Sequence, residues 1–79
     1  MMEQAIVIDS DFIRLDALMK LANWANSGGE AKHLIQEGGV RVNGTACLER
    51  SKKIRPGDRV SFAAKTLLVT RAAAVSPKQ

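Results

Sequence analysis

The spacing of apolar side chains changes near residue 40, from a helical period to a period of two. When residues are placed at 100° intervals, an arc of about 160° holds the apolar side chains Leu15, Leu18, Met19, Leu21, Ala22 and Ala25, while Asp16, Lys20 and Asn23 point the other way. This pattern predicts an amphipathic helix from Ile13 to Trp24, with its N-cap supplied by Asp9, Ser10 or Asp11.

A second helix is predicted directly after the first. The segment Ser27-Gly-Gly-Glu30 fits a capping box, in which Ser27 accepts from the Glu30 amide and Glu30 reaches back to the Ser27 amide. Gly38 and Gly39 are expected to end this helix, because glycine enters the left-handed conformation without strain. The short connection requires the two helices to pack as an angled hairpin.

Strands are predicted on both sides of this hairpin. Ala5 to Ile8 reads as a short edge strand, and Asn43-Gly44 and Pro56-Gly57-Asp58 read as turns between later strands. Inward-facing positions are expected at Val40, Val42, Val60, Phe62, Leu67 and Val69, with Arg41 facing outward. The order of the elements, a short strand, two helices and then three or four strands, predicts an α+β fold. In this fold a two-helix hairpin packs on a small, mostly antiparallel sheet of three to five short strands.

Composition narrows the functional classes. The chain has 79 residues, 46% of them apolar, so we expect one domain over 1–79, with a frayed tail from about residue 73. One cysteine, Cys47, permits no internal disulfide, and with His33 it falls short of a four-ligand metal site. Without a nucleophile–base pair or a phosphate-binding loop, we expect no enzyme and no cofactor. The absence of a signal peptide or a long apolar run predicts a cytoplasmic protein.

Charge is distributed unevenly along the chain. Residues 1–39 carry a net charge of −3, whereas residues 40–79 carry nine lysines and arginines against two acidic residues, a net charge of +7. The densest stretch runs from Arg50 to Arg59 and reads as a basic loop. Such asymmetry favours a polyanionic partner, although a solvated basic face kept for solubility is the alternative.

Three segments together resemble the S4 RNA-binding domain: Arg14-Leu-Asp16, the stretch from Ser27 to Gly44, and Lys53-Ile-Arg-Pro-Gly-Asp-Arg-Val60. The resemblance covers about residues 12–62 and is greatest to the small stand-alone S4-domain proteins of bacteria. It implies an S4-like, alpha-L type fold and RNA binding by the helix hairpin and the adjoining strand loop, without a catalytic centre. Many members of the wider family carry a lysine or arginine where this sequence has Gly28.

The candidate RNA-binding residues combine this resemblance with simple chemistry. A helix opened by Ser27 and Gly28 exposes backbone N–H groups to a phosphate, and Lys32 adds a charge one turn later. Lys52 and Lys53 belong to the basic stretch that begins at Arg50, whose positive charges repel one another unless a partner neutralises them. The full candidate set is Arg14, Lys20, Ser27, Gly28, Lys32, Arg41, Asn43, Arg50, Lys52, Lys53 and Arg55.

Several of these residues also have a purely structural explanation. Ser27 caps a helix whatever the function, Asn43 belongs to a turn, and Lys20 lies four residues after Asp16, at the spacing of a surface ion pair. Trp24 is expected mainly in the core, with a contact surface as the alternative. His33 is expected to be an ordinary surface histidine, and Cys47 a small half-buried hydrophobe.

The sequence therefore predicts a monomeric, non-catalytic module that binds structured RNA, either ribosomal or transfer RNA, with the ribosome as its context. Few aromatic residues and no basic helix argue against a base-stacking platform and against a DNA-recognition helix. No membrane and no small-molecule substrate are expected. The alternative is a small adaptor that uses the same fold to bind a protein partner and does not use its basic loop to bind RNA.

Overall fold

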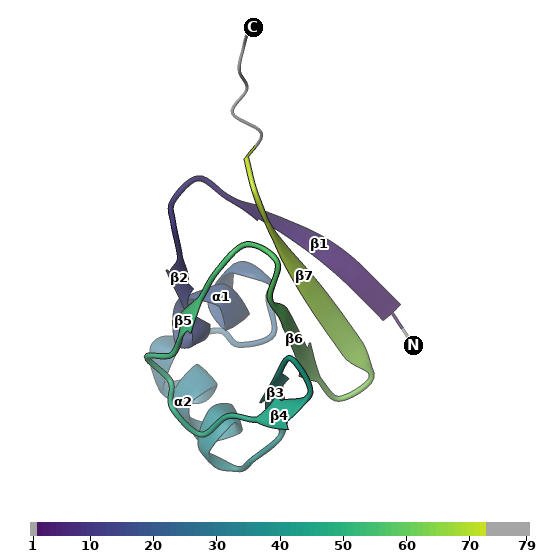
Figure 1. Cartoon of the computed structure of the whole chain (residues 1–79). Coiled ribbons are helices and arrows are strands. Elements are labelled where there is room, and N and C mark those ends of the chain that lie inside the picture. Colours follow the sequence, from purple (N-terminus) through teal and green to yellow (C-terminus); the bar gives the residue numbers. More distant parts are fainter. Residues whose placement is uncertain (1, 73–79) are drawn as a thin grey trace, which may run out of the picture.

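The computed structural model describes residues 2–72, in which two short helices pack beside a twisted sheet (Figure 1). The tail predicted from about residue 73 lies outside the described residues. In chain order the elements are β1 (Met2–Ile8), β2 (Ile13–Arg14), α1 (Leu15–Leu21), α2 (Gly28–Gln36), β3 (Val40–Val42), β4 (Thr45–Ala46), β5 (Lys53–Ile54), β6 (Arg59–Phe62) and β7 (Lys65–Arg71).

Five of the strands form one sheet in the order β1-β7-β6-β3-β4. The pairs β3–β4, β3–β6 and β6–β7 are antiparallel, whereas β1 runs parallel to β7 along its whole length. The predicted α+β class and the mostly antiparallel sheet are confirmed. A second, two-stranded sheet joins β2 to β5 and was not predicted.

One hydrophobic core joins the helices to one face of the sheet. Every inward-facing position predicted for β3, β6 and β7 is buried, except Phe62, which is half-buried and packs at the edge of the core against Trp24, with ring centroids 5.8 Å apart. Trp24 is likewise half-buried, so its predicted place in the core is confirmed in part. The fully buried side chains from the helices are Leu15, Leu18, Met19, Ala31 and Ile35.

The first helix is shorter than its apolar pattern predicts. It spans Leu15–Leu21, its N-cap is Arg14 without a side-chain cap, and the predicted caps at Asp9, Ser10 and Asp11 are wrong. The backbone N–H groups of Leu15 and Asp16 donate instead to the carbonyls of Lys52 and Arg50, so a distant segment satisfies the helix start. Leu21, predicted in the apolar arc, is 55% exposed because the helix ends there.

The second helix begins as predicted, with one difference. Ser27 Oγ accepts from the Glu30 amide at 3.1 Å, but Glu30 Oε1 accepts from the amide of Asn26 at 2.6 Å rather than from that of Ser27. The helix ends at Gln36, and Gly38 takes a φ of 85°, which is left-handed backbone that favours glycine.

Both predicted turns are present. Asn43 and Gly44 take φ values of 53° and 88° between β3 and β4, as a type I′ hairpin requires. In the turn from Arg55 to Asp58, Gly57 has a φ of 99° and the Asp58 amide donates to the Arg55 carbonyl at 3.0 Å.

Candidate nucleic-acid interface

Asp16 joins the start of α1 to the basic segment that follows β4. Its side chain was predicted to face solvent, but the residue is only 7% exposed, and that prediction is wrong. The carboxylate lies 3.1 Å from the Arg14 guanidinium and 3.5 Å from that of Arg50, and it accepts the Ala17 amide at 2.8 Å. Two candidate RNA-binding cations are therefore held by one internal carboxylate.

The stretch from Arg50 to Arg59, expected to be a loop, is largely held in place by backbone pairing. Lys53 and Ile54 form β5, in which Lys53 pairs with Arg14 of β2. The Lys53 ammonium lies 4.9 Å from the centre of the Phe12 ring, within the range of a cation–π contact. These cations therefore project from a defined backbone rather than from a flexible loop.

Asp58 ties the turn of this basic segment to the β3–β4 hairpin. One carboxylate oxygen accepts from the Asn43 side-chain amide at 3.1 Å, and the other accepts from the Arg55 backbone amide at 2.8 Å. The Asn43 side-chain oxygen in turn accepts from the Arg59 amide at 2.9 Å. Asn43 was predicted to contact RNA; in the structure its side chain holds two turns together.

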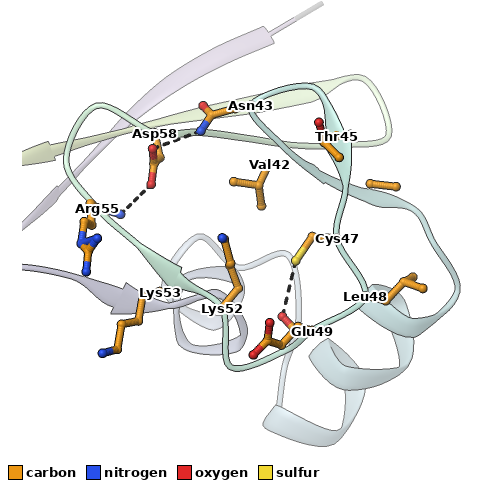
Figure 2. Close-up of a pocket in the computed structure, with 11 residues that line it drawn as sticks. Val42, Asn43, Thr45, Cys47, Leu48, Glu49, Lys52, Lys53, Arg55 and Asp58 are labelled. Atoms are coloured by element: carbon orange, nitrogen blue, oxygen red, sulfur yellow. Dashed lines mark hydrogen bonds between the residues drawn. The ribbon is translucent and has the colours of Figure 1, made fainter.

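Between the hairpin and the basic segment lies an open pocket of about 780 Å³ (Figure 2). Its walls combine apolar side chains with cations, and it brings together four candidate residues, Asn43, Lys52, Lys53 and Arg55. The Lys52 side chain points into the space between Asp58 and Cys47, whereas Lys53 points away from it. Cys47 is half-buried as predicted, and its thiol donates to the Glu49 carbonyl at 3.6 Å.

The candidates of the helix hairpin form a separate group. Ser27 and Gly28 begin α2, and a Cβ added at Gly28 would meet no atom within 4 Å, so the helix start is open. Lys32 is exposed in the second turn of the same helix. Lys20 lies in the last turn of α1, and the acid four residues before it is bound to Arg14 and Arg50 instead.

Arg41 projects from β3 as predicted, between the buried Val40 and Val42. Successive side chains of a strand point to opposite faces, so Arg41 and the pocket-lining Val42 lie on opposite faces of the sheet. One guanidinium nitrogen of Arg41 donates to the Gly44 carbonyl at 3.4 Å.

The charge pairing within residues 2–72 divides the cations into two groups. Arg14, Arg50, Arg59 and Arg71 form salt bridges with aspartate or glutamate. His33, predicted to be an ordinary surface histidine, is exposed and lies 3.0 Å from Glu37. The lysines and arginines of the described segment without an acidic partner within 4.0 Å are Lys20, Lys32, Arg41, Lys52, Lys53, Arg55 and Lys65.

Sequence reasoning missed several residues that shape the pocket. Thr45, Leu48, Glu49 and Asp58 line it without having been singled out as candidates. The Pro-Gly-Asp turn hinted at the position of Asp58, because aspartate commonly bonds to backbone near a turn. Nothing local indicated Thr45 or Leu48, since their place depends on how the hairpin meets a distant segment.

The described residues hold neither a membrane-spanning helix nor a cluster of metal-ligating side chains. Over 2–72, no helix is long and apolar enough to cross a membrane. Nor do three histidine, cysteine, aspartate or glutamate side chains gather within that stretch as a metal site would need.

Comparison with known proteins identifies the family. A family model of the S4 domain matches residues 6–70, most of the chain. The chain therefore belongs to the S4 domain family, and the predicted resemblance is confirmed.

Relatives and solved structures agree with this assignment. YbcJ of Escherichia coli K12 is 40% identical over 57 residues, which cover 72% of this chain and 81% of YbcJ. The solution structure of YbcJ, described as revealing an alpha-L motif involved in RNA binding, matches with a TM-score of 0.62 at 34% identity, over 86% of this chain and 85% of that one. The predicted alpha-L type of fold is confirmed by this match.

Two further proteins extend the comparison. The Bacillus subtilis protein named "Probable ribosome maturation protein RlbA" is 39% identical over 61 residues, covering 77% of this chain and 86% of RlbA. The trimeric structure of heat shock protein 15 from Vibrio cholerae matches with a TM-score of 0.60 at 23% identity, over 67% of this chain and 52% of that one. At that identity the likeness concerns the fold alone.

Proposed function

We propose that this protein is a non-catalytic RNA-binding module that recognises structured RNA, ribosomal or transfer RNA, in the context of the ribosome. The YbcJ structure is described in terms of RNA binding, and RlbA is named for ribosome maturation. A ribosomal context would place the protein in the cytoplasm. Structured RNA is recognised mainly through its shape, its phosphates and its 2′-hydroxyls, and cationic side chains are suited to the phosphate contacts.

The observation that carries the proposal is the pattern of charge pairing. Six candidate cations, Lys20, Lys32, Arg41, Lys52, Lys53 and Arg55, have no acidic partner within 4.0 Å among residues 2–72. Acidic side chains that could neutralise them are engaged elsewhere: Asp16 with Arg14 and Arg50, and Asp58 with Asn43 and the Arg55 amide. The unpaired charge therefore remains available to phosphates.

A matched set of single substitutions tests the proposal. Lys32→Ala and Lys52→Ala each remove an unpaired candidate cation, one from the helix hairpin and one from the pocket. Lys65→Ala is the control, because Lys65 is equally unpaired but lies at the β6–β7 turn, outside the candidate set. Affinity for purified ribosomal RNA, transfer RNA and a fully paired RNA hairpin would be measured by titration. We expect the first two variants to bind more weakly and the control to bind as the unchanged protein does.

Equal losses for all three variants would mean that the protein is a general basic surface without a defined interface. Absence of binding to every RNA would contradict the proposal and favour the second candidate, a small adaptor for a protein partner. The exposed Leu21 and Val7, which line one shallow hollow beside β1, favour that candidate. Crosslinking in cells followed by sequencing of the recovered RNA would identify which RNA is bound.

A further inference from the structure

The pocket between the hairpin and the basic segment has walls of two chemical kinds. Val42, Ala46, Cys47 and Leu48 form apolar surface, and Leu48 is 61% exposed. Lys52 directs its ammonium group into the same space, and Lys53 and Arg55 lie at its margin, with the Lys53 side chain pointing away (Figure 2). A volume of about 780 Å³ lies within the range of about 300–1,000 Å³ that is usual for small-molecule sites.

The two acidic side chains of the pocket are already bound to donors of the protein. Asp58 uses both oxygens, one for the Asn43 amide and one for the Arg55 backbone amide. Glu49 accepts from the Ser51 hydroxyl at 3.3 Å. These hydrogen bonds leave the carboxylate charges in place, so the lining carries three cations against two acids, a net charge of +1. An anionic group is therefore expected at Lys52, whose side chain points into the space (Figure 2), rather than throughout the pocket.

Lys52 combines a fixed backbone with a free ammonium group. Its amide donates to the Glu49 carbonyl at 3.2 Å and its carbonyl accepts from the Leu15 amide at 2.9 Å, so the backbone is held from both sides. Its side chain points into the pocket (Figure 2), and no acid within residues 2–72 pairs with it. A cation held in this way can bind one anionic group at a defined place.

We propose that this pocket receives one unpaired nucleotide of the bound RNA, with its base against the apolar wall at Val42 and Cys47 and its phosphate at Lys52. The inference rests on the proposed function and names the element of RNA that the site selects. A nucleotide joins an apolar base face to an anionic phosphate, which matches the two kinds of wall. Bases in bulges and loops are the usual targets of specific RNA recognition because they can leave the stack.

The test compares three RNA hairpins that differ at one position: a hairpin with a single-nucleotide bulge, the same hairpin with an abasic residue at the bulge, and a fully paired hairpin. We expect the unchanged protein to bind the bulged hairpin about tenfold tighter than the abasic one, the factor expected when roughly 55 Å² of apolar base surface is buried at about 25 cal/mol per Å². Equal binding of the bulged and abasic hairpins, with affinity that still falls steeply with salt, would overturn the inference and leave the proposed function standing. Absence of binding to all three would contradict the proposed function itself.

Two variants, Thr45→Phe and Lys52→Met, test whether the preference for the bulged hairpin depends on the pocket. Thr45 pairs with Val42 and so shares its face of the hairpin, and phenylalanine is well suited to a strand. Thr45→Phe fills the pocket without changing its charge and is expected to abolish the bulge preference while keeping affinity for the paired hairpin. Thr45→Val, of nearly the same size, is the control and should keep the preference. A preference that survives Thr45→Phe would overturn the inference.

Lys52→Met provides a second variant that does not depend on the folding of Thr45→Phe. It is expected to weaken binding of the bulged hairpin about tenfold or more, as for one charge-assisted hydrogen bond, and more than it weakens binding of the paired hairpin. Lys65→Met is the charge-matched control and should leave the ratio of the two affinities unchanged. Equal weakening of both hairpins by Lys52→Met would contradict a phosphate contact specific to the bulge.

A free nucleotide carries the same chemistry as an unpaired RNA residue. Adenosine 5′-monophosphate would therefore be titrated against the protein, alone and in competition with the bulged hairpin. We expect it to compete only weakly, because the RNA contributes further phosphate contacts outside the pocket. Tight binding of the free nucleotide together with no preference for the bulge would overturn the assignment to RNA.

Discussion

At the scale of single residues, Asp16 connects two segments of the candidate interface that lie far apart in the sequence. Its buried carboxylate binds Arg14, Arg50 and the Ala17 amide, and thereby holds the basic segment over the start of α1. A carboxylate with several donors cannot be replaced without leaving some of them unpaired.

Asp16→Asn is expected to lower the free energy of unfolding by about 1.5–3 kcal/mol, the range for hydrogen bonds that involve charged groups. The amide keeps the volume but loses the charge that two guanidinium groups share. Urea denaturation of the variant and of Asp9→Asn, which changes an exposed acid, would measure the effect. Equal midpoints for the two variants would show that the carboxylate does not hold the segment.

The role of Asp16 could not be predicted from the sequence. Its position on the helical wheel indicated solvent, and the Arg50 that covers it lies far along the chain. Ser27 and Gly38, in contrast, were predicted correctly because a cap and a helix end depend on neighbouring residues. Residues whose role is set by local geometry are therefore predictable here, and those set by a distant contact are not.

At the scale of elements, α2 depends on its cap, because it is only nine residues long. Ser27→Ala removes the acceptor of the Glu30 amide and is expected to cost about 0.5–2 kcal/mol of stability. Ser27→Asp, which keeps an acceptor at the same place, is the control and should retain most of the stability in urea denaturation. A midpoint that Ser27→Ala leaves unchanged would mean that the helix is held by its packing alone.

Gly28 separates the stability of α2 from its proposed contact with RNA. The position is open and its φ is not left-handed, so Gly28→Ala is expected to stabilise the protein by about 0.4–1 kcal/mol by reducing the freedom of the unfolded chain. The same methyl group would stand where a phosphate approaches the helix start, so affinity for RNA should fall. Gly29→Ala is the control in both thermal unfolding and RNA titration. Unchanged affinity for Gly28→Ala would remove Gly28 from the interface.

The boundaries of helices and strands were likewise predictable where neighbouring residues set them and not where a distant contact does. The hairpin turn at Asn43-Gly44 and the start of α2 were predicted because their residue types favour those conformations. The pairing of β2 with β5 was missed, since each strand has two residues and no alternation to recognise. Consequently the pocket, which depends on where β5 lies, could not be predicted, although its cations were.

At the scale of the whole molecule, the uneven charge of the two halves is expected to set most of the proposed affinity for RNA. The second half carries +7, and several of its cations have no acidic partner within 4.0 Å in the stretch that the structure describes. If four or five phosphates are neutralised, the logarithm of affinity should fall against the logarithm of salt concentration with a slope of about −3 to −4. A fourfold rise in salt would then weaken binding about 100-fold. A slope near zero for structured RNA would contradict electrostatic binding.

The parallel pairing of β1 with β7 links the order of synthesis to the order of folding. β1 is synthesised well before β7, the strand with which it pairs, and the register joins Met2 to Lys65 and Ile8 to Arg71. Contacts between such distant segments form late and slow folding, because the intervening chain must first be ordered. Until β7 has been made, β1 has no partner strand and is open to strands of other chains, so we expect a nascent copy to be prone to aggregation through β1.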